Sequence, residues 1–455
     1  MKPRRRSLPR IVYPILLAAG VVGIALTRRE EEAVPAKLPE DLTGAIHEAV
    51  NADGDGELKK FYEATGYAPV WRERRNEAVA ALMTAGTRGL KPQDYFTLDS
   101  VTDPVRQDIA LTKGLLGYVS DVRFGRHNPG IYAKPDLDSL SDMVHRIAND
   151  PAGLEAGVRK LDPPFAEYQR LAAALEKYQK LAEIDMTALE QVRQIERTLE
   201  RWRWLPQSLD HGAILVNIPE FRVRALDENL HVALDMKAIV GLTTHPTPLF
   251  TADLKYLIFG PYWNVPASIL ANELVPDIVK DRTYLARNAY EVLNSEGRVI
   301  STGEVSDEVL AGLRSGALRV RQVPGPKNAL GRVKFMFPNN NDVYLHDTPS
   351  RNLFAREQRA LSHGCVRVEQ PQALAEWVLR DEPDWTQERI TEALKQTKPL
   401  QANLTQSVPV FMLYHSVTVS EDGEVHFWKD LYKQDAALAE QILATSAAPG
   451  PRPRE

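Results

Sequence analysis

The sequence has little cysteine, no excess of positive charge and no histidines at the spacing of metal ligands, and each of these features would indicate a function. It contains one cysteine in 455 residues, so no disulfide can form within the chain. The formal net charge is -5, which gives no support for nucleic-acid binding, because a domain that binds phosphates normally carries a basic face. His231 and His245 lack the spacing of metal ligands. The remaining composition, 44% hydrophobic and 26% charged, is that of a globular chain long enough for two or three domains.

Basic residues concentrate at the N-terminus, where they precede an apolar run that begins at Ile11. Because more positive charge lies before this run than after it, we expect a cytoplasmic N-terminus (1–10), a membrane anchor (11–27) and a polar linker (28–45). The run is short for a transmembrane helix, which needs about 17 to 25 residues, so a cleaved signal peptide stays an alternative. The first interpretation predicts a single-pass inner-membrane protein with a periplasmic body, and the second predicts a periplasmic protein.

The period of the apolar residues divides the body into two parts. Apolar residues recur at helical spacing over 46–185, which predicts a helical domain, and 186–210 is expected to be a connecting helix. Over 211–435 the period changes to two, as is typical of strands, although a mostly helical insertion interrupts the pattern at 267–322. Residues 436–455, whose end is rich in Pro and Arg, are expected to be a disordered tail. The sequence therefore predicts a multidomain α+β protein.

The single cysteine lies in a Ser-His-Gly-Cys motif at 362–365. A lone cysteine is commonly a small buried hydrophobe, but the histidines near this one favour a reactive thiol. The thiolate is the nucleophile and a free cysteine ionises near pH ~8.5, so a reactive site needs a base or a cation nearby. On a strand, His363 and Cys365 would point to the same face, and Gly364 between them would let a substrate approach the backbone. His346 lies nineteen residues before Cys365 in another strand-like run, so either histidine could be the base.

The order of these residues resembles the catalytic domain of the L,D-transpeptidase family. The signature of that family is a His, a spacer of about fifteen residues and then Ser-His-Gly-Cys, and here the spacer 347–361 follows His346. The segments 328–339 and 121–126 resemble the large, membrane-anchored branch of the family, the first before the base and the second in its helical scaffold domain. The resemblance implies a scaffold domain and then a β-rich catalytic domain, whose insertion forms a cap over the active-site groove. The small peptidoglycan-binding module of many members has no counterpart in this sequence.

The resemblance also implies roles for the motif residues. Cys365 is the expected nucleophile and His346 the general base, with the His346 ring held by a backbone carbonyl such as that of Asp347. The N–H groups of Gly364 and Cys365 would stabilise an oxyanion, and His363 would position the substrate or support the intermediate. The residues expected to bind substrate are Arg367, whose planar guanidinium suits a carboxylate, and Ser362, Asp347, Tyr262, Trp263 and Asn339. Packing accounts equally well for the two aromatic residues.

The reaction that the resemblance implies is a two-step acyl transfer on peptidoglycan stem peptides. A donor tetrapeptide would lose its terminal D-alanine as a thioester forms with Cys365, and the amine of a neighbouring stem would resolve the thioester into a 3-3 cross-link. No metal or cofactor is required. The expected partners are peptidoglycan stems, the inner membrane and cell-wall synthesis proteins, and not nucleic acid. The alternatives are an L,D-carboxypeptidase, a transferase that joins a protein to the wall, and a non-catalytic wall-binding scaffold.

Overall fold

The computed structural model describes residues 41–96, 103–132 and 138–446. The described residues from Thr43 onward belong to one compact unit. The predicted cytoplasmic segment and membrane anchor lie outside the described residues, as does most of the predicted linker. Within the described ranges, no helix is both long enough and apolar enough to cross a membrane.

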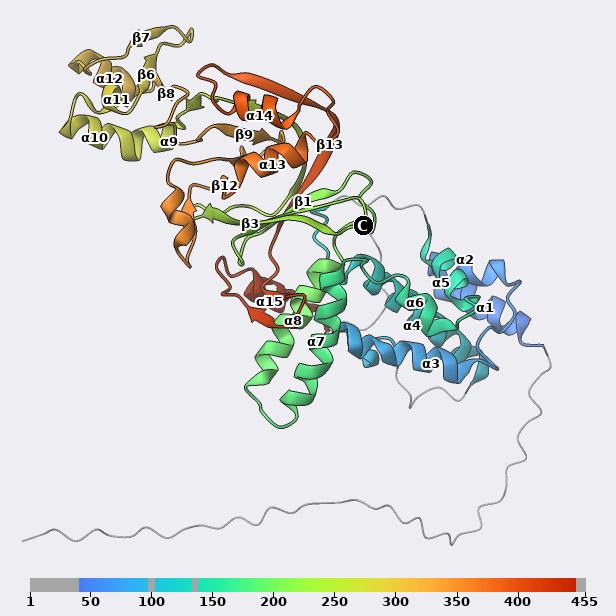
Figure 1. Ribbon diagram of the computed structural model, residues 1–455. Coiled ribbons are helices and arrows are strands. Elements are labelled where there is room, and N and C mark those ends of the chain that lie inside the picture. The colour runs from blue at the N-terminus through green and yellow to red at the C-terminus, as the bar shows by residue number, and fades with distance from the viewer. Residues whose placement is uncertain (1–40, 97–102, 133–137, 447–455) are drawn as a thin grey trace, which may run out of the picture. The chain divides into compact units, whose positions relative to one another are not determined.

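The first part of the chain is helical, as its apolar spacing predicts (Figure 1). The side chain of Asp55 accepts hydrogen bonds from the N–H groups of Glu57 and Leu58 at 2.9 and 3.2 Å, so it caps a helix start. In that helix Leu58, Phe61 and Tyr62 lie three or four positions apart and are fully buried. The elements of this part are α1 (Thr43–Asp53), α2 (Gly56–Ala64), α3 (Arg75–Met83), the 3-10 helices η1 (Thr84–Arg88) and η2 (Pro92–Asp94), α4 (Pro104–Phe124), α5 (Leu140–Ala148), α6 (Leu154–Arg159) and α7 (Ala166–Ala182).

Helix α8 (Ala188–Trp202) lies where the sequence predicts a connecting helix. Its residues Ile195 and Leu199 are fully buried in a hydrophobic cluster. The same cluster contains residues of α7 and, from the β-rich part, Leu215 and Phe411. The helical part and the β-rich part therefore share one apolar core at α8.

The second part is built on a sheet that, among the described strands, has nine members in the order β11-β3-β12-β10-β9-β4-β13-β1-β2. Because β2 also pairs with β3, the strands from β3 round to β2 close on themselves. A turn at 227–230 joins β2 to β3. The strands are β1 (Ala213–Asn217), β2 (Arg222–Leu226), β3 (Val232–Gly241), β4 (Thr251–Phe259), β9 (Val333–Met336), β10 (Leu345–His346), β11 (Ala360–Ser362), β12 (Val366–Val368) and β13 (Leu400–Leu413). A separate pair consists of β14 (Val417–Val419) and β15 (Val425–Phe427).

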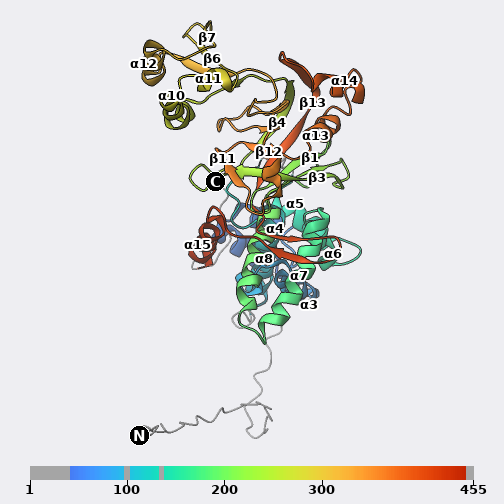
Figure 2. The same ribbon diagram turned by 60° about the vertical axis from the view of Figure 1, so that its left-hand side comes forward.

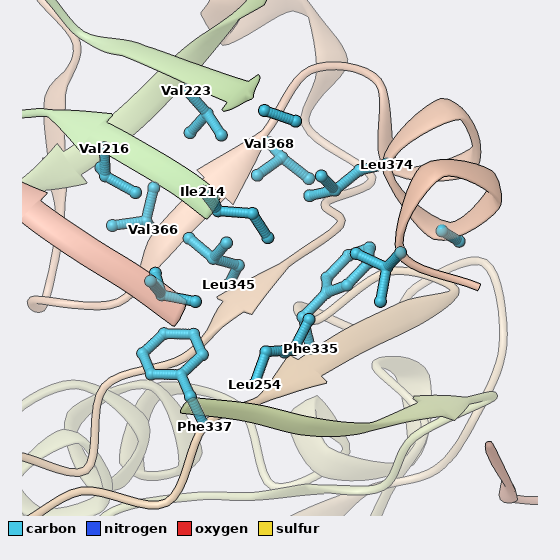
Figure 3. Packing of buried hydrophobic residues seen from close by; sticks show 14 of the residues in the cluster. Ile214, Val216, Val223, Leu254, Phe335, Phe337, Leu345, Val366, Val368 and Leu374 are labelled. Atoms are coloured by element: carbon cyan, nitrogen blue, oxygen red, sulfur yellow. The ribbon is translucent and has the colours of Figure 1, made fainter. Parts of the chain in front are cut away.

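Alternate side chains of this sheet point into a core that α13 (Pro371–Val378) and α14 (Gln387–Ala393) cover. Figure 3 shows Leu345 of β10 and Val366 of β12 in this core, with Val368 of β12 close to Leu374 of α13. Successive side chains of a strand point to opposite faces. The residues next to Leu345 and Val366 therefore point away from the core, and these are the residues of the predicted catalytic motif.

The insertion at 267–322 is helical, as expected, but it also contains strands. Its strands β6, β7 and β8 form a sheet with β5 in the order β5-β8-β6-β7. Figures 1 and 2 both show α10, α11 and α12 gathered beside β6, β7 and β8. The elements are β5 (Trp263–Asn264), α9 (Ala267–Ile269), the π-helix η3 (Leu270–Leu274), α10 (Val275–Lys280), α11 (Tyr284–Arg287), β6 (Tyr290–Leu293), β7 (Val299–Ser301), α12 (Asp307–Ser315) and β8 (Arg319–Gln322). Buried residues from both helices and strands give the insertion its own hydrophobic core.

The prediction of a disordered tail is wrong for residues 436–446. They belong to helix α15 (Gln434–Ser446), which packs against α8. The buried carboxylate of Asp435 pairs with Arg201 of α8 at 2.5 Å, and Leu438 is buried in the core that α8 shares with the sheet. The ion-pair partner of this helix, Arg201, lies more than two hundred positions earlier in the chain, so local sequence pattern does not reveal that contact.

Candidate active site

Neighbouring strands bring five polar side chains to one face of the sheet. Strand β10 pairs in parallel with β12 and antiparallel with β9, so His346 lies opposite Arg367 on one side and Lys334 on the other. Residues opposite each other in a ladder share a face, as do residues two apart on a strand. Tyr344 precedes His346 by two positions, and Cys365, just before β12, lies close enough to Tyr344 and Arg367 for both to lower the pKa of its thiol. The sheet thus pairs the strand that carries the predicted base with the strand that directly follows the predicted nucleophile.

Cys365 itself lies in a turn, and the prediction that it shares a strand with His363 is wrong. Strand β11 ends at Ser362, and Gly364 has a φ of +114°, a conformation that side chains other than glycine rarely adopt. The Ser362 hydroxyl donates to the carbonyl of Cys365 at 2.5 Å and accepts the N–H of Gly364 at 3.2 Å. The hydroxyl of Thr247 donates to the carbonyl of Gly364 at 2.7 Å. Hydrogen bonds from two sides therefore fix the turn that carries the thiol.

This turn changes two of the predicted roles. The N–H of Gly364, expected to stabilise an oxyanion, donates to Ser362 instead. Ser362 is 2% exposed and both of these hydrogen bonds lie within the turn, so its side chain positions Cys365 rather than a substrate. The expected contribution of the Cys365 N–H to an oxyanion site stays a prediction.

The ring of His346 is oriented as expected. Its Nδ1 lies 2.5 Å from the carbonyl oxygen of Asp347, and because a carbonyl can only accept, Nδ1 carries the proton and Nε2 is left as an acceptor. The side chain is buried, and this burial, followed by the positive charge of Arg367, lowers the pKa of His346 to about 3. His346 is therefore a neutral imidazole, ready to accept a proton, throughout the physiological pH range.

The thiol of Cys365 is also neutral in the free protein. Burial raises the pKa of Cys365 above its usual range, against the opposing effects of the Tyr344 N–H and hydroxyl and of Arg367. The sulfur lies 3.7 Å from the carbonyl oxygen of Asp342, within reach of a weak S–H hydrogen bond. The sequence analysis missed Tyr344 as a neighbour of the thiol, although its place two residues before His346 on a strand was a usable signal.

Two cations flank the thiol. Burial lowers the pKa of both Arg367 and Lys334, and the nearby Cys365 thiolate, when formed, opposes this shift in each. The Lys334 ammonium lies 5.5 Å from the ring centre of Tyr344. Among the described residues, the buried Nε of Arg367 has no hydrogen-bond partner. Because this donor is enclosed, the pairing of Arg367 with a substrate carboxylate stays a prediction. Lys334 adds a second positive charge that nothing in the local sequence marks.

The other predicted substrate-binding residues make structural contacts. The Asp347 carboxylate accepts the N–H of Arg332 and pairs with Arg351. The Asn339 amide donates to two backbone carbonyls of the connection between β9 and β10. Tyr262 lies under the guanidinium of Arg321, which is 4.0 Å from its ring centre, and Trp263 packs against the core of the insertion. For these four residues a substrate contact stays a prediction, and packing or turn formation is what the geometry supports.

His363 has an acidic partner that the sequence did not indicate. Its Nε2 lies 2.6 Å from the Oε1 of Glu273, which belongs to the π-helix η3 of the insertion. The ring of His245 lies on another side, with 5.3 Å between the ring centres. Glu273 was missed because it precedes His363 by ninety positions, and nothing in the local pattern marks it.

The residues gathered at this site are typical of one class of enzyme site. A half-buried thiol, a neutral imidazole on the neighbouring strand and two cations are groups that acyl-transfer sites with a cysteine nucleophile use. Among the described residues, no cluster of three or more His, Cys, Asp or Glu side chains is suited to hold a metal ion.

Comparisons with known proteins give the family. Residues 211–394 match the YkuD model, described as the L,D-transpeptidase catalytic domain, and 56–175 match a scaffold-domain model. A curated protein of Haemophilus influenzae, provisionally named an L,D-transpeptidase, is 32% identical over 401 residues, which cover 84% of this chain and 78% of that protein. This chain belongs to the L,D-transpeptidase family.

A solved structure of an L,D-transpeptidase from Mycobacterium smegmatis is also similar to part of the chain. The match has a TM-score of 0.23 and 12% sequence identity. It covers 46% of this chain and 60% of that one, so this chain spans less than two thirds of the length of that structure.

Proposed function

We propose that the chain is a peptidoglycan L,D-transpeptidase that forms 3-3 cross-links through a thioester on Cys365. The observation that carries this proposal is the pairing of β10, which holds an oriented, neutral His346, with β12, which directly follows the only cysteine of the sequence. Membership in the L,D-transpeptidase family supplies the substrate class, which is the stem peptide of peptidoglycan.

In the first step, Nε2 of His346 takes the thiol proton as Sγ of Cys365 bonds to the carbonyl carbon before the terminal D-alanine. The bond from that carbon to the D-alanine nitrogen then breaks, and His346 returns its proton to the departing amine. The acyl group remains on sulfur as a thioester. Because thiol and imidazole are both neutral at rest, the proton moves as substrate is attacked and no ion pair is needed beforehand.

In the second step, an amine of a neighbouring stem attacks the thioester and releases the thiol. The guanidinium of Arg367 holds a stem carboxylate, and Lys334 stabilises negative charge that develops near the sulfur. If water replaces the amine, the same site is an L,D-carboxypeptidase, and if the acceptor is a protein, it joins that protein to the wall. We favour the stem amine because it is the acceptor that the name of the family implies.

The place of the reaction follows from the N-terminal sequence. The basic residues and apolar run at 1–27 support an anchored protein with its body on the periplasmic side of the inner membrane. An alkaline phosphatase fusion after residue 45 tests this topology, because that reporter folds only outside the cytoplasm. A fusion that stays inactive would contradict export of the body.

The chemistry is tested by incubating the purified full chain, in detergent, with a disaccharide-tetrapeptide and following both protein and product masses. We expect a thioester on Cys365, release of D-alanine and a 3-3 linked dimer. The Cys365→Ala variant should form none of these while it unfolds at the temperature of the native chain. Turnover by Cys365→Ala would overturn the mechanism.

The products separate the proposed reaction from its alternatives. Tripeptide without dimer would identify a carboxypeptidase. An intact thiol that no substrate and no carbapenem acylates would favour the non-catalytic scaffold, because a functional site of this design must react with a strained carbonyl.

A further inference from the structure

The insertion contributes a carboxylate to the nucleophile turn. Glu273 Oε1 lies 2.6 Å from His363 Nε2, so the imidazole N–H donates to the carboxylate when His363 is neutral. The π-helix around Glu273 is marked by the N–H of Val275, which bonds to the carbonyl of Leu270, five positions back. Such π-helical turns are rare and occur frequently at functional sites. The contact joins two segments that are distant in sequence. Its histidine, His363, directly precedes Gly364 and Cys365.

The surroundings of this pair are open to solvent. The side chain of Glu273 is 50% exposed and that of His363 is 36% exposed. The other titratable groups that face the pair are His245, beside the ring of His363, and the hydroxyls of Tyr284 and Tyr290. Burial raises the pKa of both tyrosines, and the carboxylate of Glu273 adds to this effect in each, so both hydroxyls stay neutral at physiological pH.

The two imidazoles near Cys365 differ in what can reach them. His346 is 4% exposed and its Nδ1 is held by a backbone carbonyl, which suits a base that serves the neighbouring thiol. The amine that resolves the thioester arrives from solvent as an ammonium ion, and it must lose a proton before it can attack. A base for this amine has to be accessible to solvent. Of His346 and His363, only His363 is exposed.

We propose that Glu273 orients His363 as the base that deprotonates the acceptor amine in the second step. This inference rests on the proposed transpeptidation. Glu273 is then a positioning residue, and because it belongs to the insertion, the acceptor base is complete only when the insertion contacts the nucleophile turn.

The acceptor ammonium gives one proton to Nδ1 of His363, and the carboxylate of Glu273 stabilises the imidazolium that forms. The free amine bonds to the thioester carbon, and as the bond from carbon to Sγ of Cys365 breaks, a second proton passes from nitrogen to sulfur. The amide product leaves, and His363 releases its proton to solvent.

The test measures the two half-reactions separately in the full chain. The disaccharide-tetrapeptide is the donor and acceptor, the first-turnover burst of D-alanine reports acylation, and the dimer reports aminolysis. In Glu273→Gln we expect the burst to stay within about twofold of the native rate, while dimer formation at pH 7 falls about tenfold. General bases contribute about 10² to 10⁴ in rate, and loss of the orienting group removes part of that.

Two further measurements distinguish this role from a merely structural one. The defect of Glu273→Gln should shrink as the pH approaches the pKa of the acceptor amine, because the amine then needs no base. The double variant Glu273→Gln/His363→Gln should form dimer no more slowly than His363→Gln alone, since Glu273 acts through His363. Glu304→Gln, the same change at an exposed site of the insertion, is the matched control and should keep both rates.

The outcomes separate this inference from the proposed function. If the native chain acylates but makes no dimer, transpeptidation itself fails. If the native chain makes dimer and Glu273→Gln lowers burst and dimer equally, Glu273 only holds the insertion in place and the inference is wrong. An unchanged dimer rate in Glu273→Gln would overturn it as well.

Discussion

Cys365 and His346 are both kept neutral by burial, and this decides how the reaction starts. A preformed thiolate-imidazolium pair would react with many electrophiles. In the proposed mechanism the half-buried neutral thiol of Cys365 reacts only when a bound carbonyl draws the sulfur electrons. Tyr344 and Arg367 reduce the free energy needed to form the thiolate, because both lower the pKa of Cys365 while burial raises it. The site therefore combines a low resting reactivity with nearby support for the charged state.

The first prediction concerns the pH dependence of acylation. Burial lowers the pKa of His346 to about 3, so its basic form persists as the pH falls from 7 to 5. We expect the rate at which a carbapenem acylates Cys365 to change by less than about threefold over that range, whereas a base of pKa ~6.5 would lose most of its activity. Stopped-flow fluorescence or intact-protein mass spectrometry measures this rate.

The control for that experiment is His363→Gln, which removes the other imidazole near the thiol. If the acylation rate of this variant also stays nearly constant between pH 7 and 5, the base that remains active at low pH is His346. A tenfold loss of rate per pH unit below pH 6.5 in His363→Gln would contradict the assignment of a depressed pKa to His346.

Among the structural elements, the turn between β11 and β12 gives Cys365 a conformation that a strand would not allow. A strand would hold Cys365 in the ladder, but the turn frees its backbone and lets Ser362 and Thr247 fix the orientation of the thiol. Only glycine suits position 364, and the reason is the backbone conformation rather than space. A Cβ added at Gly364 would meet one atom within 4 Å, the carbonyl oxygen of Pro246 at 3.7 Å.

The second prediction is that Gly364→Ala lowers both stability and acylation. An alanine at a φ of +114° costs about 1 to 3 kcal/mol, and relief of that strain would move Cys365. Gly316→Ala is the matched control, because Gly316 also has a positive φ (+76°) and open space, yet it ends a helix of the insertion. We expect thermal unfolding to report a loss in both variants and carbapenem acylation to slow in Gly364→Ala alone. Native-like acylation by Gly364→Ala would show that the turn tolerates another conformation.

At the scale of the whole molecule, α8 connects the helical part, the sheet and the C-terminal helix. Its apolar face lies in the core that the helical part shares with the sheet. Two charged residues of α8 are also buried in ion pairs: Arg201 is 3% exposed and pairs with Asp435, and Glu200 pairs with Arg203, which follows the helix. Since a buried ion pair leaves a costly charge when one partner is removed, α8 makes the stability of each part depend on the others.

The third prediction tests that dependence. Asp435→Ala leaves Arg201 buried without its carboxylate, and we expect the free energy of unfolding to fall by about 3 to 5 kcal/mol. Asp381→Ala is the control, because Asp381 is 72% exposed in its pair with Arg380 and such pairs contribute about 0 to 1 kcal/mol. Urea unfolding followed by tryptophan fluorescence measures both. A loss below 1 kcal/mol in Asp435→Ala would mean that α15 contributes little to the fold.

Local pattern was sufficient for much of the architecture. The helical spacing at Leu58, Phe61 and Tyr62 and the cap at Asp55 give α2 directly, because these signals act within a few residues. The alternation around Leu345 likewise predicted a strand that carries His346. The sequence misjudged α15, the strands of the insertion and the turn at Cys365, since each depends on contacts with distant segments.

The sequence alone was sufficient to identify the reactive residues of this protein. One thiol, a histidine nineteen positions before it and the Ser-His-Gly-Cys motif indicate an acyl-transfer site of the L,D-transpeptidase family, because nucleophile, base and spacing are local properties of the chain. Only the tertiary structure decided that both reacting groups are neutral, that Ser362 holds the turn, and that Tyr344, Lys334 and Glu273 surround the site. Burial, strand register and the approach of the insertion set those properties, and each arises from residues that are far apart until the chain folds.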